Sequence, residues 1–160
     1  MQNVNLLCVG KLKEKFYSEA CAEYQKRLTR FCRLSITELA EERLPEDPSP
    51  AQIAQALARE AEAVRAKLPR GGAVIALCVE GRELSSPALA EAMQRYAALG
   101  ISQLTFLIGG SFGLDEGLKA SADLRLSMSP MTFPHHLARV MLLEQIYRAY
   151  QIQSGTRYHK

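Results

Sequence analysis

The sequence has no tryptophan, only 7% aromatic residues and little net charge. Its 20 Lys and Arg against 17 Asp and Glu leave a formal charge of +3, too weak for a protein that grips long stretches of nucleic acid. Any nucleic-acid site must therefore be local. No apolar run approaches the ~20 residues of a membrane span, and 48% hydrophobic residues exclude intrinsic disorder. The 160 residues predict a single domain, residues 1–160, with a sizeable core.

The cysteines form no CxxC pair. Three of them, Cys8, Cys32 and Cys78, lie in apolar patterns, where a reduced thiol behaves as a small hydrophobe, and Cys21 is the fourth. No basic segment followed by an apolar segment marks a secretory signal at the N-terminus. We therefore expect reduced cysteines, no structural disulfide or zinc, no membrane anchor and a cytoplasmic location.

Strands and helices are predicted to alternate. Continuous apolar runs predict strands at 3–9, 73–79 and 103–108, an alternating pattern predicts one at 33–40, and 124–128 is a candidate fifth strand. Helices are predicted at 16–31, 50–68, 86–100, 115–122 and 134–152. This alternation indicates an α/β fold with a mostly parallel sheet covered by helices on both faces. Ligands bind at the carboxyl ends of such strands. The loops after Val79, Ile108 and Met128 are therefore the candidate site.

A proline-rich loop at 41–50 is the only linker-like stretch, and it is too short to divide the chain into domains. We expect it to be a surface excursion. Ser49, Pro50 and Gln52 then form a capping-box pattern that predicts the start of the next helix.

Two candidate ligand loops follow the later strands. Gly109, Gly110 and Gly113 permit positive φ and a close approach of a ligand to the backbone, although their spacing fits neither GxGxxG nor GxxxxGK[ST]. A strained turn without a ligand stays open as the alternative. The loop Ser127–Pro134 mixes hydroxyls, prolines and methionines, which suits a flat heteroaromatic ligand held by main-chain bonds. It equally suits a plain helix entry whose hydroxyls cap the helix.

The adjacent histidines His135 and His136 point to different sides of a helix, so they cannot bind one metal in the manner of HExxH. We expect capping or solvated residues there, and no metal.

The last helix is apolar over more than one stripe, which predicts burial on several sides and a homodimer formed through a two-fold contact. Its polar residues Glu144 and Arg148 either pair with each other at i,i+4 or leave Arg148 beside the tail to meet phosphate. In the tail, Tyr158 can stack on a nucleobase while Arg157 and Lys160 meet backbone phosphate. A solvated terminus is the alternative.

These elements together carry a resemblance over essentially the whole chain. It rests on Val9-Gly10-Lys11, Leu107–Gly110 with Gly113-Leu114, Ser129–His135, Arg139, Glu144-Gln145, Tyr147–Ala149 and Tyr158–Lys160. The chain is similar to the RlmH family, SPOUT-class methyltransferases of the large-subunit ribosomal RNA. The resemblance implies a C-terminal trefoil knot, a homodimer and S-adenosylmethionine as cofactor. The implied reaction is methyl transfer to N3 of a pseudouridine in 23S rRNA on the assembled ribosome.

The resemblance also implies roles for individual residues. The cofactor pocket would be lined by Leu77, Gly110, Ser129, Pro130, Met131, Thr132, Phe133 and Pro134. The RNA would be addressed, across the dimer, by Arg148, Tyr158, His159 and Lys160. Of these, His159 is the candidate base for the N3 proton and Arg148 the candidate for fixing the nucleobase or phosphate.

Two positions depart from the family pattern. Cys78 stands where many relatives have an acidic residue after the third strand, which leaves a polar cofactor contact without its usual residue. Arg157 stands where proline often precedes the terminal tyrosine. Two other functions remain as alternatives: a nucleotide-binding regulatory module without catalysis, and a SPOUT methyltransferase of transfer RNA. Truncation of Tyr158–Lys160 separates the first of these from an enzyme, because only an enzyme loses methyl transfer.

Overall fold

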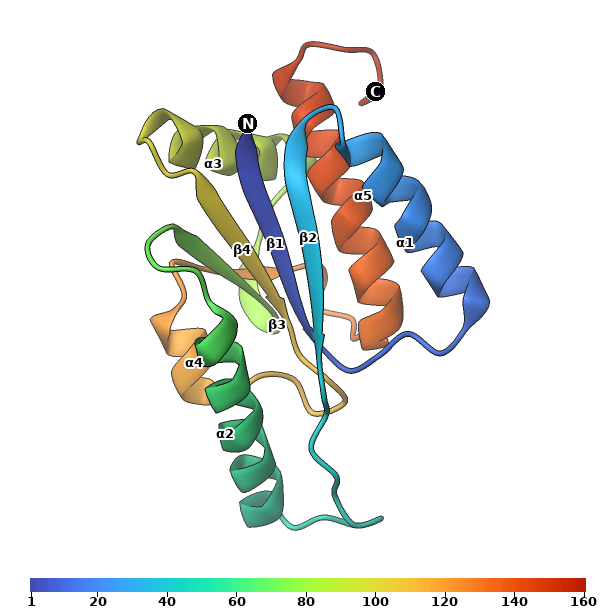
Figure 1. The fold of residues 1–160 in the computed structure, drawn as a ribbon, viewed down its shortest axis with the longest axis vertical. Helices are drawn as coiled ribbons and strands as arrows, with labels where there is room; N and C mark the ends of the chain where they lie inside the picture. Colours follow the sequence, from blue (N-terminus) through green and yellow to red (C-terminus); the bar gives the residue numbers. More distant parts are fainter.

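The computed structural model describes residues 1–160 and confirms the α/β prediction. Its five strands are all parallel and lie in the order β2-β1-β4-β3-β5 (Figure 1). No helix is both long and apolar enough to cross a membrane. In chain order the elements are β1 (Gln2–Val9), α1 (Lys15–Leu28), β2 (Cys32–Leu39), α2 (Pro50–Lys67), β3 (Ala73–Glu83), α3 (Ser86–Ala98), β4 (Gln103–Ile108), α4 (Glu116–Ser121), β5 (Leu124–Ser127) and α5 (His135–Gln153).

Helices cover both faces of the sheet, which explains why the strands read as continuous apolar runs. In β1, Val4 and Leu6 belong to the larger core cluster, which includes side chains of α1, α3 and α5. Leu7 and Val9 point to the opposite face and belong to the smaller cluster with α2 and α4. The helices thus form two layers, with α1, α3 and α5 on one face and α2 and α4 on the other.

The predicted boundaries hold to within three residues except at β3. The predicted capping box is confirmed: Ser49 Oγ accepts a hydrogen bond from Gln52 N–H at 3.1 Å, and Gln52 Oε1 accepts one from Ser49 N–H at 2.8 Å. β3 was predicted to end at Val79 but continues to Glu83, and its register against β5 shifts between Leu77 and Arg82. This irregularity leaves residues 78–81 outside the ladder with β5.

The crossovers that leave β3 and β4 run in opposite directions. The chain passes from β3 to β4 through α3, and from β4 to β5 through α4 on the other face of the sheet. The loops at the carboxyl ends of these adjacent strands therefore diverge, which creates the crevice in which open α/β sheets bind ligands.

All four cysteines are free, as predicted. The buried thiols are Cys8, Cys21 and Cys32, whereas Cys78 is only half-buried. Burial raises the pKa of Cys8 to about 12, so this thiol is un-ionised at neutral pH. Cys78 thus differs from Cys8 and Cys32, although all three lie in apolar sequence patterns, because the backbone of β3 is irregular after Leu77.

Candidate functional site

A cavity of about 830 Å³ opens at the carboxyl ends of β3, β4 and β5. This volume is in the usual range for small-molecule sites. The segments that follow β4 and β5 form its walls, as the sequence predicted, whereas β3 contributes its own irregular stretch Leu77–Glu80 and not a loop after Val79. Of the eight residues expected to hold a cofactor, Pro130 does not line the cavity, and the other seven do: Leu77, Gly110, Ser129, Met131, Thr132, Phe133 and Pro134.

The loop after β4 is a tight turn made of glycines. The N–H of Gly113 donates to the carbonyl of Gly110 at 3.1 Å, and Gly113 has a φ of +81°. A Cβ on Gly109 would collide with the backbone of Gly113. Only glycine fits this turn without strain, and the turn therefore exposes bare backbone at the cavity wall.

A carboxylate holds the outer side of the glycine turn. Glu41, which follows β2, accepts a hydrogen bond from Ser111 N–H at 2.7 Å. The prediction of a surface excursion at 41–50 is wrong for its first residues, because Glu41 and Glu42 are half-buried and hydrogen-bonded. Glu41 and Ser111 are 70 residues apart, so no local sequence pattern reveals their contact.

The loop between β5 and α5 is ordered by its own hydroxyls. Ser127 Oγ donates to the carbonyl of Ser129 at 3.0 Å, and Ser129 Oγ accepts from Met131 N–H at 3.0 Å. No hydroxyl caps α5, because Pro134 occupies the N-cap position and makes no side-chain cap bond. The expected capping role is therefore wrong, and the hydroxyls instead fix the shape of this cavity wall.

His135 and His136 both line the cavity and are half-buried, so they are neither capping nor solvated residues. His136 Nε2–H donates to the carbonyl of Lys11 at 3.1 Å, and the ring stacks on Tyr17 with centroids 5.8 Å apart. Burial lowers the pKa of His135, with a smaller contribution from the neighbouring His136. His135 is therefore neutral at pH 7. No group of three or more His, Cys, Asp or Glu side chains is arranged to hold a metal.

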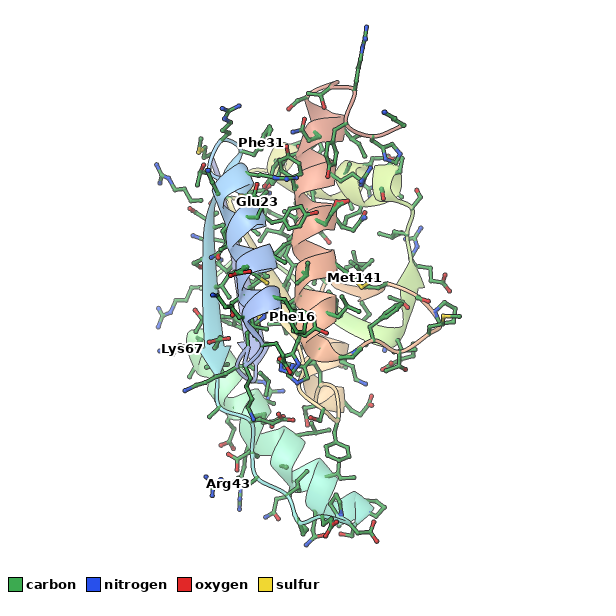
Figure 2. All side chains as sticks on the ribbon, turned by 90° about the vertical axis from the view of Figure 1, so that its right-hand side faces the viewer. Phe16, Glu23, Phe31, Arg43, Lys67 and Met141 are labelled. Carbon is green, nitrogen blue, oxygen red and sulfur yellow. The ribbon has the colours of Figure 1, made fainter.

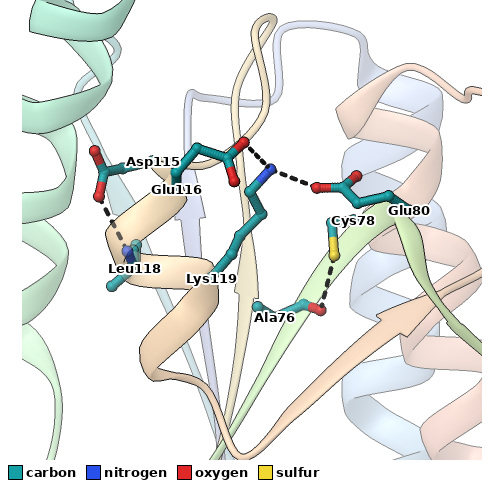
Figure 3. Close-up of polar contacts among 7 residues, drawn as sticks. All are labelled: Ala76, Cys78, Glu80, Asp115, Glu116, Leu118 and Lys119. Carbon is teal, nitrogen blue, oxygen red and sulfur yellow. Dashed lines mark hydrogen bonds and ion pairs between the residues drawn. The ribbon is translucent and has the colours of Figure 1, made fainter.

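A buried ammonium group forms another wall of the cavity (Figure 3). Lys119 on α4 is 8% exposed and pairs with Glu80 and with Glu116, the latter at 2.9 Å. Burial opposes the charge of Lys119, but the hydrogen bonds to Glu116 and Glu80 outweigh it and raise the pKa. The hydrogen bond from Lys119 in turn lowers the pKa of Glu80. Both groups are therefore charged at neutral pH, and the lysine fixes the carboxylate at the cavity wall.

Glu80 lies close to the position where the family pattern has an acidic residue. Cys78 itself has a half-buried thiol 4.0 Å from the carbonyl of Ala76, and burial raises the pKa of this thiol (Figure 3). Two residues later, Glu80 presents a carboxylate to the same cavity. The sequence did not indicate Lys119 as a cavity residue, since its partner Glu80 lies 39 residues away.

The C-terminal tail folds back onto the end of α5. Arg148 donates to Glu144 at 2.7 Å, its guanidinium lies 4.7 Å from the centre of the Tyr158 ring, and its Nη1 lies 3.2 Å from His159 Nδ1. Tyr158 also packs edge-on against Tyr147, with centroids 5.0 Å apart. Arg148 therefore pairs with Glu144 and also lies beside the tail, and its contact with phosphate stays a prediction.

The contact with Arg148 fixes the tautomer of His159. Arginine has only donors, so His159 Nδ1 must accept the hydrogen bond. The proton of a neutral ring then resides on Nε2. In this arrangement His159 presents a donor on its free nitrogen.

The cavity and the tail lie at opposite ends of α5 (Figure 1). The helix from His135 to Arg148 spans ~20 Å along its axis. A single chain therefore does not bring Arg148, Tyr158 and His159 to the residues expected to hold the cofactor.

The side of the molecule formed by α1 and α5 carries apolar side chains that lack full cover (Figure 2). No residue of α5 is fully exposed, yet Leu137 and Met141 are only half-buried and belong to neither core cluster. Phe16 on α1 is 62% exposed. Figure 2 shows Phe16 and Met141 on the same side of the molecule, and we refer to these three residues as the apolar face Phe16–Leu137–Met141.

Comparison with known proteins gives a consistent result over the whole chain. A sequence model described as "Predicted SPOUT methyltransferase" matches residues 2–159. A protein of Leuconostoc mesenteroides named "Ribosomal RNA large subunit methyltransferase H" is 46% identical, covering 99% of both chains. A protein of the same name from Streptococcus equi subsp. zooepidemicus is 45% identical over 98% of this chain and 99% of its own length. A third, from Methanococcus maripaludis and named "Putative ribosomal RNA large subunit methyltransferase H", is 44% identical over 99% of both.

Solved structures share the fold at low identity. A probable methylase family protein from Haemophilus influenzae superposes with a TM-score of 0.56 at 12% identity, covering 99% of this chain and 71% of the other. A putative methylase family protein from Neisseria gonorrhoeae gives a TM-score of 0.56 at 14% identity, covering 99% and 87%.

Proposed function

Because this chain belongs to the SPOUT methyltransferase family, we propose that it transfers the methyl group of S-adenosylmethionine to N3 of a pseudouridine in 23S rRNA on the assembled ribosome. The observation that carries the proposal is the identity of about 45%, over the whole chain, to relatives named for methylation of the large-subunit RNA. The trefoil knot is inferred from the same family membership. Action on ribosomes places the protein in the cytoplasm.

The cavity fits the cofactor in size and in chemistry. A volume of about 830 Å³ suits a nucleoside with an amino-acid arm. Leu77 and Phe133 supply apolar surface for the adenine, while Gly110 and the loop from Ser129 to Pro134 supply backbone groups for hydrogen bonds. The cofactor, when bound, supplies a methyl group already activated by its sulfonium. The protein therefore has mainly to position the accepting nitrogen.

A homodimer completes the site. The residues that would address the RNA lie ~20 Å from the cavity along a rigid helix, so a second copy must bring them to it. The apolar face Phe16–Leu137–Met141 offers a surface for a two-fold contact. We infer that the tail of one protomer serves the cavity of its partner.

In this composite site the tail residues have distinct tasks. Tyr158 stacks on a base, and Arg148 and Lys160 meet phosphate. The N3 proton must leave as the new N–C bond forms, and His159 is the proposed acceptor. To accept the proton, His159 must first lose its hydrogen bond from Arg148, which leaves Nδ1 as a free basic nitrogen. An RNA phosphate that draws Arg148 away would provide this.

The test is mass spectrometry of rRNA nucleosides from cells with and without the gene. We expect a methylated pseudouridine to disappear on deletion and to return when purified protein and S-adenosylmethionine are added to the deletion-strain ribosomes. A modification that persists in the deletion strain would refute the function. Methylation of transfer RNA in place of ribosomes would favour the related alternative.

A further inference from the structure

Glu41 lies behind the glycine turn and does not itself line the cavity. We propose that Glu41 is a positioning residue: it holds the turn Gly109–Gly113 in the shape that the cofactor requires. The identity of the ligand rests on the proposed function, whereas the hold on the turn does not.

One carboxylate oxygen acts directly on the turn. Glu41 Oε1 accepts the hydrogen bond from Ser111 N–H at 2.7 Å. The same oxygen lies 2.6 Å from the place where a Cβ on Gly110 would stand. The carboxylate is thus in close contact with the bare backbone of Gly110, and the turn cannot shift outward without displacing it.

The other oxygen faces a second element of the cavity. Glu41 Oε2 lies 3.8 Å from the Cβ position of Gly10, at the end of β1. The ring of His135, the first residue of α5, lies 2.9 Å from that same position. Glu41 therefore occupies the junction of three segments that meet at the cavity: the end of β1, the glycine turn and the start of α5.

The backbone that carries Glu41 is itself anchored. Glu60 on α2 is 8% exposed, and its Oε2 accepts a hydrogen bond from Glu42 N–H at 2.8 Å. This bond joins the start of the 41–50 loop to a packed helix. Glu41 is therefore held on the protein side before any ligand binds, as a positioning residue must be.

If Glu41 holds the turn, removal of its carboxylate should weaken the binding of the cofactor. A turn freed from Glu41 samples other shapes, and the ligand then binds only the fraction that retains the competent one. We expect Glu41→Ala to raise the Kd for S-adenosylmethionine about tenfold, or about 1.4 kcal/mol. Glu41→Gln keeps both the acceptor oxygen and the shape, so its Kd should remain within about threefold of the wild type.

The experiment compares wild type, Glu41→Ala, Glu41→Gln and Glu46→Ala by calorimetric titration with S-adenosylmethionine. Glu46 is the matched control, because it is an exposed glutamate of the same loop with no hydrogen bond or ion pair in the structure. An irreversibly misfolded fraction of a variant would lower the stoichiometry at unchanged Kd, whereas reversible unfolding of the whole chain would raise the Kd and would also speed amide exchange outside residues 107–114. A raised Kd at full stoichiometry in Glu41→Ala alone supports positioning. An unchanged Kd in Glu41→Ala overturns it.

Amide hydrogen exchange of the ligand-free protein separates this proposal from the function. Peptides covering 107–114 should exchange faster in Glu41→Ala than in Glu46→Ala. Unchanged exchange there would overturn the role of Glu41. A wild-type protein that binds no S-adenosylmethionine would instead overturn the proposed function, whatever the exchange shows.

Discussion

The buried ion pair between Arg139 and Glu38 offers a sharp test of how the start of α5 is held. Arg139 is 3% exposed, and its guanidinium donates to Glu38 at 2.7 Å and to the carbonyl of Gly10 at 3.2 Å. The Glu38 side chain is 35% exposed. Removal of Glu38 therefore leaves a buried charge, whereas removal of Arg139 leaves a carboxylate that water can reach.

Glu38→Ala leaves a buried guanidinium without a counter-charge. Such changes lower the free energy of unfolding by about 3–5 kcal/mol. We expect the low end, about 3 kcal/mol, because water can reach the side that Glu38 vacates. Arg139→Met removes the charge and keeps apolar volume. It leaves a carboxylate that water already reaches and one unpaired carbonyl, so we expect about 1–2 kcal/mol.

The double variant decides the matter. The double variant contains no buried charge, so its loss in free energy of unfolding should be about that of Arg139→Met alone. It should therefore be more stable than Glu38→Ala. Urea unfolding followed by circular dichroism, at one fixed protein concentration, measures all four proteins. A double variant less stable than Glu38→Ala would refute the reasoning.

The same pair predicts a pH dependence with a definite sign. Burial opposes the charge of Glu38, but the hydrogen bonds from Arg139 and from Leu12 N–H prevail and lower its pKa below the usual 4.5. A carboxyl with a depressed folded-state pKa contributes stability above its unfolded value and loses it as the pH falls through the folded value. The stability gap between wild type and Glu38→Ala should therefore be full above pH 4.5 and narrow below it.

Three further outcomes are expected. Deletion of Tyr158–Lys160 should lower methyl transfer to ribosomes at least ~100-fold, measured with labelled cofactor, while the calorimetric Kd for S-adenosylmethionine stays unchanged. Met141→Glu should place a charge in the apolar face and give monomers by light scattering, with methyl transfer lost; dimers that persist would exclude this face as the interface. Ser49→Ala should cost about 1 kcal/mol of stability in urea, through loss of the α2 cap, without changing cofactor affinity.

The location of the cavity could be predicted from the sequence because it depends only on the order of strands and helices along the chain. Alternating elements imply parallel strands, and parallel strands place the loops after them at one edge. Gly110 and Ser129–Pro134 follow two such strands, so their convergence required no knowledge of side-chain contacts. The contact between the tail and Arg148 could also be predicted, since the tail and Arg148 both lie within about three turns of the same helix end.

The contacts that shape the cavity could not be predicted from the sequence, because they join residues that are far apart in the chain. Glu41 meets Ser111 across 70 residues, and Lys119 meets Glu80 across 39. Nothing in the local pattern of either segment specifies a distant partner. The end of β3 was also missed, because its final residues Glu80–Glu83 are mainly polar, and only Arg82 and Glu83 of them pair with β5, through the backbone.

The separation of the cavity and the tail links assembly to activity. Each half of the proposed site is complete within one chain, since the glycine turn is held by Glu41 and the tail by Arg148. A rigid helix keeps the halves ~20 Å apart, so no local movement of the tail can join them. Cofactor binding should therefore survive in a monomer while methyl transfer cannot. The proposed assembly from two copies, docked on a ribosome, would also account for the weak charge of +3, because such a site needs few basic residues of its own.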